Sequence, residues 1–203
     1  GGAGDDQLVG GGGDDVLNGG DGNDLIKPGL GNDTMNGGKG DDSYYWSLGS
    51  GMKRLSDDGG YDRLILTGGI DPSMIRLSLG SLMISTGTEG DELHLDGVDY
   101  DNIAETSPVD VVEFSDGQEM TTGEMIEAVG IDIAATEQTD ILEGTSARDN
   151  IDALAGDDTV LAGSGNDIID GGTGNDTVYA GDGNDTLQGG DGEDILEGGA
   201  GAD

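Results

Sequence analysis

A nine-residue period with an aspartate at a fixed place is the feature that most constrains how this chain can fold. The first 45 residues divide without remainder into GGAGDDQLV, GGGGDDVLN, GGDGNDLIK, PGLGNDTMN and GGKGDDSYY. Each unit has glycine at its second and fourth places, aspartate at its sixth, and an apolar or aromatic residue at its eighth. Because four kinds of place agree over successive units, the pattern predicts a structural repeat.

The same period returns in the last third of the chain. Its sixth-place aspartates are Asp140, Asp149, Asp158, Asp167, Asp176, Asp185, Asp194 and Asp203, and those of the first 45 residues are Asp6, Asp15, Asp24, Asp33 and Asp42. In a strand of three residues the middle side chain points away from the direction of its two neighbours. The eighth-place side chains are therefore expected inside the fold, and the seventh- and ninth-place side chains outside it.

A fold of this kind has a thin core, because each nine-residue unit offers one large apolar side chain. Burying that side chain does not offset the entropy of ordering the unit. A hard divalent cation would supply the missing stabilisation, since it binds six to eight oxygens of carboxylates and backbone carbonyls. Glycine-rich turns leave carbonyls free, and the aspartate supplies the charge. The alternative is an acidic tail that stays disordered.

These units resemble the glycine-rich nonapeptide repeats of the RTX family, which occurs in bacterial secreted toxins, proteases, lipases and adhesins. The resemblance implies an all-β fold of parallel β-roll (β-solenoid) arrays, in which two units form one coil and aspartates two units apart are stacked. It also implies several Ca²⁺ ions, each held between stacked aspartates and by carbonyls of the turns. The implied metal ligands are Asp6, Asp15, Asp24, Asp33, Asp42, Asp149, Asp158, Asp167, Asp176, Asp185, Asp194 and Asp203, with Gly2, Gly4, Gly11, Gly13, Gly20, Gly22, Gly29, Gly31, Gly38, Gly40, Gly163, Gly165, Gly172, Gly174, Gly181, Gly183, Gly190 and Gly192.

The period is interrupted in the middle of the chain. We expect a first array over residues 1–45, a small β-rich region that caps and links over 46–134, and a second array over 135–203. Within the middle region, alternating apolar residues predict short strands, and one short helix is expected near Thr122–Val129. The residues expected in its core include the aromatic side chains Tyr44, Tyr45, Trp46 and Tyr61.

The stretch YYWSLGSGMKRLSDDGGYDRLILTGG opens the middle region and resembles a pattern that often follows RTX arrays. Gly59, Gly60 and Asp62 fit that pattern. Lys53 stands where the pattern has an aspartate, which argues against a metal ion at that point. Lys53 and Arg54 are instead expected to neutralise the acidic end of the first array.

The charge of the chain restricts its partners. It carries 44 acidic and 7 basic residues, a formal net charge of −37, which disfavours nucleic acid and anionic membranes as partners. It has no cysteine, so neither disulfides nor thiolate metal sites are available. No stretch is long and apolar enough to predict a transmembrane helix, and no signal peptide is visible at the amino end.

The sequence does not favour an enzyme. The single histidine, His94, lies in DELHLDG, where strand alternation places it opposite Leu93 and Leu95. No G-x-S-x-G nucleophile motif is present. Asp71-Pro72, which in some RTX proteins marks a self-cleavage point, is interpreted as a plain turn before a strand.

The function expected from this resemblance is calcium-driven folding. In a low-calcium cytosol the chain would stay extended, as suits export by type I secretion machinery from a Gram-negative bacterium, and extracellular calcium would then fold it. The sequence begins and ends inside repeat units, so we expect it to belong to a longer secreted toxin, adhesin or exoenzyme. The alternative is a module that recognises a host-surface receptor, a polysaccharide or ice, although the outward seventh places, such as Gln7, Thr34 and Ile168, form no regular threonine ladder.

Overall fold

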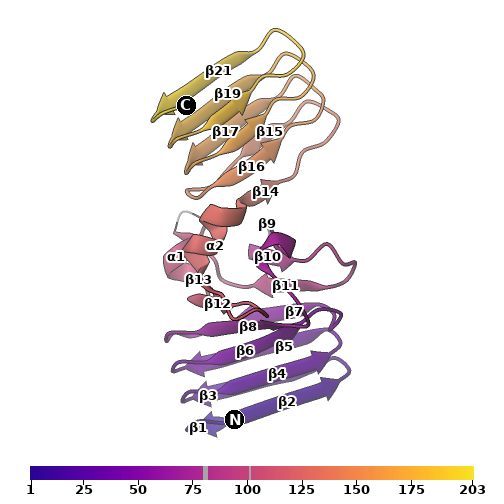
Figure 1. The fold of residues 1–203 in the computed structure, drawn as a ribbon, viewed down its shortest axis with the longest axis vertical. Coiled ribbons are helices and arrows are strands. Elements are labelled where there is room, and N and C mark those ends of the chain that lie inside the picture. Colours follow the sequence, from indigo (N-terminus) through magenta and orange to yellow (C-terminus); the bar gives the residue numbers. More distant parts are fainter. Residues whose placement is uncertain (80–81, 101) are drawn as a thin grey trace. The chain divides into compact units, whose positions relative to one another are not determined.

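The computed structural model describes residues 1–79, 82–100 and 102–203 of the chain. The fold is nearly all-β, with 48% of the residues in strands and 7% in helices, and its parallel strands stack into coils of a β-solenoid (Figure 1). The β-solenoid fold that the RTX resemblance implied is therefore confirmed.

The chain divides into two compact units. The first unit contains Gly1–Asp99 and Ala104–Met125, and the second contains Tyr100–Ile103 and Ile126–Asp203. Each unit contains one of the two nonapeptide arrays together with part of the middle region, and each is described below by itself.

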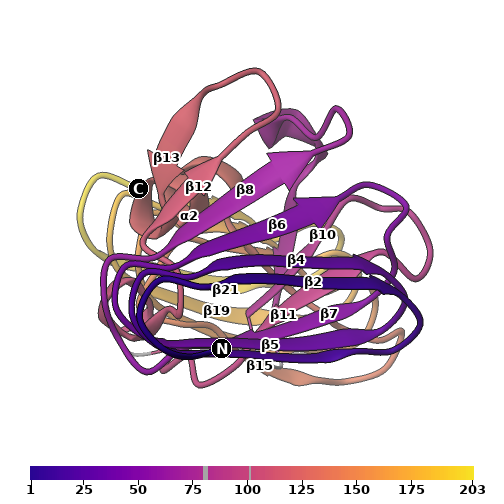
Figure 2. The same ribbon diagram turned by 90° about the horizontal axis from the view of Figure 1, so that it is seen from below.

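Successive strands of the first unit alternate between two parallel sheets. One sheet has the order β1-β3-β5-β7 and the other the order β8-β6-β4-β2, whose strands fan out in Figure 2. Gly2 pairs with Gly20, the residue at the same place two nonapeptides further on, so two nonapeptides form one coil. The strands are β1 (Gly2–Ala3), β2 (Gln7–Gly12), β3 (Val16–Asp21), β4 (Leu25–Leu30), β5 (Asp33–Lys39), β6 (Ser43–Ser47), β7 (Lys53–Ser56) and β8 (Arg63–Thr67).

The coil grows longer where the nonapeptides end. Met35 pairs with Leu55 and Tyr44 pairs with Leu64, so that paired residues lie further apart along the chain than two nonapeptides. Strands β7 and β8 nevertheless continue both sheets in parallel. The stacked architecture therefore extends beyond residue 45 into a sequence that has lost the nine-residue period.

The remaining strands of the first unit extend both sheets with antiparallel pairs. Strand β11 is parallel to β7 and antiparallel to β10, which is antiparallel to β9. On the other sheet, β12 is parallel to β8 and antiparallel to β13. These strands are β9 (Arg76–Ser78), β10 (Leu82–Ser85), β11 (Glu92–Leu95), β12 (Val111–Glu113) and β13 (Glu119–Thr121). The 3₁₀ turn η1 (Pro72–Met74) precedes β9 in the sequence, and the short helix α1 (Ile103–Thr106) precedes β12.

The predicted helix is α2, which spans Thr122–Val129 as expected. A capping box begins it: Thr121 Oγ1 accepts a hydrogen bond from the Glu124 amide (3.1 Å), and the Glu124 carboxylate accepts one from the Thr121 amide (2.9 Å). At its end, Gly130 takes a positive φ of +80° and donates its amide hydrogen to the Ile126 carbonyl.

The second unit repeats the two-sheet coil of the first. Its sheets have the orders β14-β16-β18-β20 and β15-β17-β19-β21, and Val160 pairs with Val178, again two nonapeptides further on. The Arg148 guanidinium donates to the last carbonyls of α2, those of Glu127 and Ala128. The strands are β14 (Ile131–Ile133), β15 (Ile141–Glu143), β16 (Asp149–Asp152), β17 (Thr159–Ser164), β18 (Ile168–Asp170), β19 (Thr177–Asp182), β20 (Thr186–Gln188) and β21 (Ile195–Ala200).

The core lies between the two sheets of each unit, and eighth-place side chains fill it as predicted. Those buried are Leu17, Ile26, Met35, Tyr44, Leu142, Ile151, Val160, Ile169 and Val178. In the last coil of the described second array, Leu196 is 45% exposed.

The aromatic residues of the middle region differ from their prediction in part. Trp46 and Tyr44 are buried as expected. Tyr45 is half-buried on the outer face, with the Lys27 ammonium 4.4 Å from its ring centroid. Tyr61 is 56% exposed, so its assignment to the core was wrong; it lies in the turn before β8 rather than on the inward face of a strand.

Candidate metal centre

A ladder of aspartates follows each edge where the coils turn. The amide of one aspartate donates a hydrogen bond to Oδ1 of the aspartate two nonapeptides later, which fixes both the backbone and the carboxylate. The contacts run from Asp6 to Asp24 (2.7 Å), Asp15 to Asp33 (2.9 Å), Asp24 to Asp42 (2.6 Å), Asp149 to Asp167 (2.8 Å), Asp158 to Asp176 (2.8 Å), Asp167 to Asp185 (2.9 Å), Asp176 to Asp194 (3.0 Å) and Asp185 to Asp203 (3.1 Å). The structure thus stacks the aspartates that the sequence places two nonapeptides apart.

The second oxygen of these carboxylates is buried and has no hydrogen-bond donor. Among the described residues, this holds for Oδ2 of Asp15, Asp24, Asp42, Asp158, Asp167, Asp176 and Asp185. A buried carboxylate oxygen without a partner is strongly unfavourable, because the group has lost its water. A row of such oxygens at the same place in successive coils indicates positions for cations.

Backbone carbonyls face the same positions. A Cβ added to Gly171, at the first place of its unit, would lie 2.5 Å from the Gly189 carbonyl oxygen of the next coil and 2.9 Å from Asp176 Oδ2. The equivalent Cβ at Gly19 would meet the Gly37 carbonyl and Asp24 Oδ2. The space beside the first-place glycine therefore lies between a carboxylate oxygen and a carbonyl oxygen.

The glycines at the second and fourth places allow adjacent turns to approach each other closely. A Cβ added to Gly20 would overlap the Gly2 carbonyl oxygen of the coil before it, and one added to Gly22 would lie 2.6 Å from the Gly4 carbonyl oxygen. The same relation repeats through both arrays, so these carbonyl oxygens lie close to the next turn. Whether each of them contacts an ion stays a prediction.

Lys53 places a cation in one of these positions. Its ammonium lies 3.0 Å from Asp33 Oδ2 and donates to the carbonyl oxygens of Gly31 (2.6 Å) and Ser50 (2.7 Å). The side chains of Lys53 and Asp33 are both fully buried. The predicted neutralisation of the acidic end by Lys53 is thus observed, whereas Arg54 pairs with Asp96 (2.6 Å) on the exposed side.

The Lys53 contacts show which oxygens converge on a cation. Gly31 is the fourth residue of its unit and Asp33 the sixth, and Ser50, in the next coil, accepts a hydrogen bond from the Gly31 amide. In the preceding coil of the same edge, the matching atoms are the Gly13 carbonyl, Asp15 Oδ2 and the Leu30 carbonyl, which accepts from the Gly13 amide. All of these potential metal ligands are oxygen atoms. Carboxylate and carbonyl oxygens suit Ca²⁺, whereas Mg²⁺ retains its water and demands strict octahedral geometry. The residues present therefore fit a calcium ion.

At several aspartates of the ladder, burial favours the neutral acid when no ion is bound. The pKa of Asp167 is raised to about 7, mainly by burial and also by the carboxylates of Asp149 and Asp185, against the opposing hydrogen bond from the Asp149 amide. Burial likewise raises the pKa of Asp149 and Asp42 to about 6 and that of Asp62 to about 8. A divalent cation would reverse this preference by favouring the charged form.

Without metal, the chain is expected to gain stability as the pH falls. The folded-state pKa values of Asp149 and Asp167, about 6 and about 7, lie above the unfolded value of 3.8. The folded state therefore binds more protons, and this contribution is lost as the pH rises from about 4 to about 7. In a chelator, the β signal in far-UV circular dichroism should therefore be larger at about pH 5 than at about pH 7.5. Equal β signals at the two pH values would contradict the expectation.

The structure adds members to the ladder beyond the aspartates that the sequence predicts as metal ligands. The Asp42 amide donates to Asp62 Oδ1 (2.8 Å), and the Asp62 amide donates to Asp110 Oδ2 (2.7 Å). In the second unit, the Asp140 amide donates to Asp158 Oδ1 (2.7 Å). Asp62 could have been found from its G-G-x-D motif, but Asp110 follows it by 48 residues, and no repeat signals that distance.

Comparison with known families agrees with this geometry. The family model described as the RTX calcium-binding nonapeptide repeat matches in four copies, at residues 1–35, 29–50, 135–169 and 170–203. No curated protein sequence matches the chain significantly. Within the described part of the chain, no helix has the length and apolar character needed to span a membrane.

Proposed function

The chain belongs to the family of RTX calcium-binding nonapeptide repeats, and from this we propose that its two arrays bind calcium cooperatively and fold when they do so. The observation that supports the proposal most directly is the row of buried, unpartnered Oδ2 atoms along the aspartate ladders. Each is an unfavourable group in the absence of metal and a ligand in its presence. Metal binding and folding are therefore linked.

Cooperativity follows from how the ligands are shared. Asp24 is stacked against Asp6 on one side and Asp42 on the other, so each inner coil contributes to two neighbouring positions. An ion that orders one coil therefore completes half of the next position. Calcium binding should consequently be steep rather than a sum of independent sites.

The same linkage suits a secreted protein. With a net charge of −37, the chain repels itself until counterions arrive, which keeps it extended where calcium is scarce. Extracellular calcium modules have dissociation constants of about 10⁻⁴–10⁻³ M, so millimolar calcium occupies such sites. We propose that the domain is exported unfolded by type I secretion machinery from a Gram-negative bacterium and folds outside the cell, as a non-enzymatic part of a toxin, adhesin or exoenzyme.

A calcium titration tests the proposed function. Far-UV circular dichroism and Trp46 fluorescence are followed together, because Trp46 is 1% exposed in the folded first unit. We expect a steep gain of β signal with calcium, a blue shift of Trp46 over the same range, and no comparable change with magnesium. A β-rich spectrum in chelator that calcium does not alter would refute calcium-driven folding.

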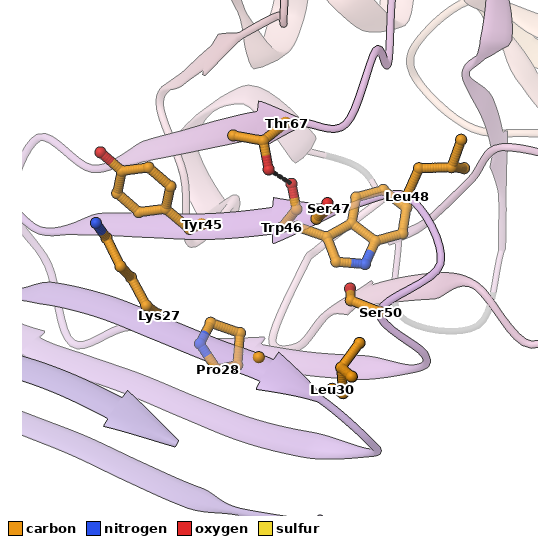
Figure 3. Close-up of a pocket in the computed structure, with 10 residues that line it drawn as sticks. Lys27, Pro28, Leu30, Tyr45, Trp46, Ser47, Leu48, Ser50 and Thr67 are labelled. Carbon is orange, nitrogen blue, oxygen red and sulfur yellow. Dashed lines mark hydrogen bonds between the residues drawn. The ribbon is translucent and has the colours of Figure 1, made fainter. Parts of the chain in front are cut away.

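A recognition module remains the second candidate, and one surface feature favours it. A cavity of about 230 Å³ lies beside Tyr45 and Trp46, with Lys27, Leu30 and Ser50 also in its lining (Figure 3). Among the described residues, Trp46 Nε1 and Ser50 Oγ have no hydrogen-bond partner, and both belong to residues of this lining. Both atoms are buried, so the groups that the cavity offers to a polar ligand such as a saccharide are the half-buried Tyr45 ring and the exposed Lys27 ammonium. Unchanged Trp46 fluorescence when saccharides are added to the calcium-loaded chain would remove this candidate.

A further inference from the structure

We use rung for one pair of stacked aspartates in a ladder. The end of the first array contains a cluster of three acidic side chains, which differs from every other rung. One carboxylate oxygen from each of Asp42, Asp57 and Asp62 lies within 4.8 Å of the others, the one such group among the described residues. Asp42 belongs to the last nonapeptide, whereas Asp57 and Asp62 belong to the longer coil that follows it. In a regular rung two stacked aspartates meet, so here a third carboxylate is added.

An unpartnered oxygen points into this cluster. Asp42 is 1% exposed, and its Oδ2 has no hydrogen-bond donor among the described residues. A Cβ added to Gly37 would overlap both Asp42 Oδ2 and the Tyr44 hydroxyl, so these two groups face the same small space. Asp62 is 2% exposed and accepts the Asp42 amide through Oδ1.

Asp57 is held rigidly toward the same space. Its Oδ2 accepts hydrogen bonds from the Tyr44 hydroxyl (2.5 Å) and the Gly38 amide (3.0 Å), and its Oδ1 accepts one from the Gly59 amide (2.9 Å). No ion pair between described residues involves Asp42, Asp57 or Asp62. Three fixed carboxylates thus lie together without a cationic side chain, although the equivalent oxygen at Asp33 has Lys53 beside it.

The Lys53 site indicates which carbonyls complete the cluster. There the cation contacts the fourth-place carbonyl of Gly31 and the carbonyl that accepts the Gly31 amide hydrogen. At the end of the other ladder, the fourth-place residue is Gly40, and its amide donates to the Gly59 carbonyl (3.2 Å). The carbonyl oxygens of Gly40 and Gly59 are therefore the matching atoms. Asp57, Gly59 and Asp62 also line a cavity of about 280 Å³.

We propose that Asp42, Asp57 and Asp62 hold a calcium ion more tightly than any two-aspartate rung of the first array. Calcium affinity in proteins rises with the number of charged ligands and with the rigidity of the site. This ion would bind first as calcium rises and would fix the coil at which the array ends, so that the earlier coils stack onto it. The inference rests on the proposed function and assigns its order of binding.

The variant D57N tests this order, with D58N as its matched control. Asp58 is the neighbouring exposed carboxylate, so both variants lose one negative charge from the same turn. Isothermal calorimetry of calcium binding and native mass spectrometry of the full chain give affinities and ion counts. We expect D57N to weaken the tightest step about tenfold, and to lose one ion at limiting calcium, because a charged ligand is removed. D58N should keep the wild-type profile.

The outcomes separate this inference from the proposed function. If the wild-type chain binds no calcium, the proposed function fails and this inference fails with it. If the wild-type chain binds calcium and folds but D57N matches D58N, the inference alone is overturned. If D57N stays unfolded at every calcium concentration, D57E is titrated instead. Recovery of the tight step by D57E supports a charged ligand, and its absence in a folded or unfolded D57E overturns the proposal.

Discussion

Replacing Lys53 by methionine is expected to lower the free energy of unfolding of the first unit by about 3–5 kcal/mol, because the change leaves a buried charge unpaired. The Lys53 ammonium is fully buried against Asp33 Oδ2 at 3.0 Å and also satisfies two carbonyls. Methionine matches its volume but brings no charge and no donor. Urea unfolding of the calcium-loaded chain, followed by Trp46 fluorescence, measures the loss.

Two further substitutions separate charge from packing. R54M removes the neighbouring cation, whose side chain is 49% exposed beside Asp96. It should lower the free energy of unfolding by less than about 1 kcal/mol. K53D restores the aspartate of the repeat pattern, so it should bind one more calcium ion than the wild-type chain. K53D should therefore be stable in saturating calcium and should need more calcium to fold than the wild-type chain. A K53M chain as stable as the wild type would show that Lys53 is not the resident cation.

Replacing Gly29 by alanine is expected to lower the free energy of unfolding by about 2–5 kcal/mol, the sum of a strained backbone and an overlap. Gly29 has a positive φ of +90°, and an added Cβ would overlap the Gly11 carbonyl oxygen of the coil before it. The overlap is with backbone, which cannot move aside without separating two paired strands.

Gly11 is the matched control, because it pairs with Gly29 in the same sheet and has a φ of +100°. An added Cβ at Gly11 has nothing within 4 Å, so G11A should suffer the backbone strain alone, about 1–2 kcal/mol. Trp46 fluorescence during urea unfolding compares the two variants in calcium. Equal losses would mean that the close approach of the coils does not limit the side chain at this place.

Contacts and side-chain directions that repeat with the nine-residue period could be predicted from the sequence, whereas contacts outside the period could not. The spacing of Asp24 and Asp42 and the inward direction of Ile26 follow from a local pattern that repeats, so both could be read before the fold was known. Asp62 and Asp110 are 48 residues apart, and they meet because strands β8 and β12 pair across a long connection. No local signal encodes such a pairing.

Single side chains without a periodic context were the hardest to place. The position of Lys53 predicted neutralisation of charge, but not that its ammonium would be enclosed by three oxygens. Asp57 carried no signal of its own, because its role depends on the Tyr44 hydroxyl and the Gly38 amide in the coil before it. Tyr61 was misplaced because a turn, rather than a strand, precedes Arg63.

The parallel register, in which each coil repeats after two nonapeptides, also gives each array a mechanical character. Each coil contacts only the coils next to it, as Gly29 pairs with Gly11, so the outermost coil is held from one side only. Under a pull on one end, we therefore expect the coils to open one at a time from that end. Each coil releases about 60 Å of chain, from two nonapeptides extended at about 3.3–3.6 Å per residue. The array would therefore lengthen in equal steps under tension and lose its bound ions in the order in which the coils open.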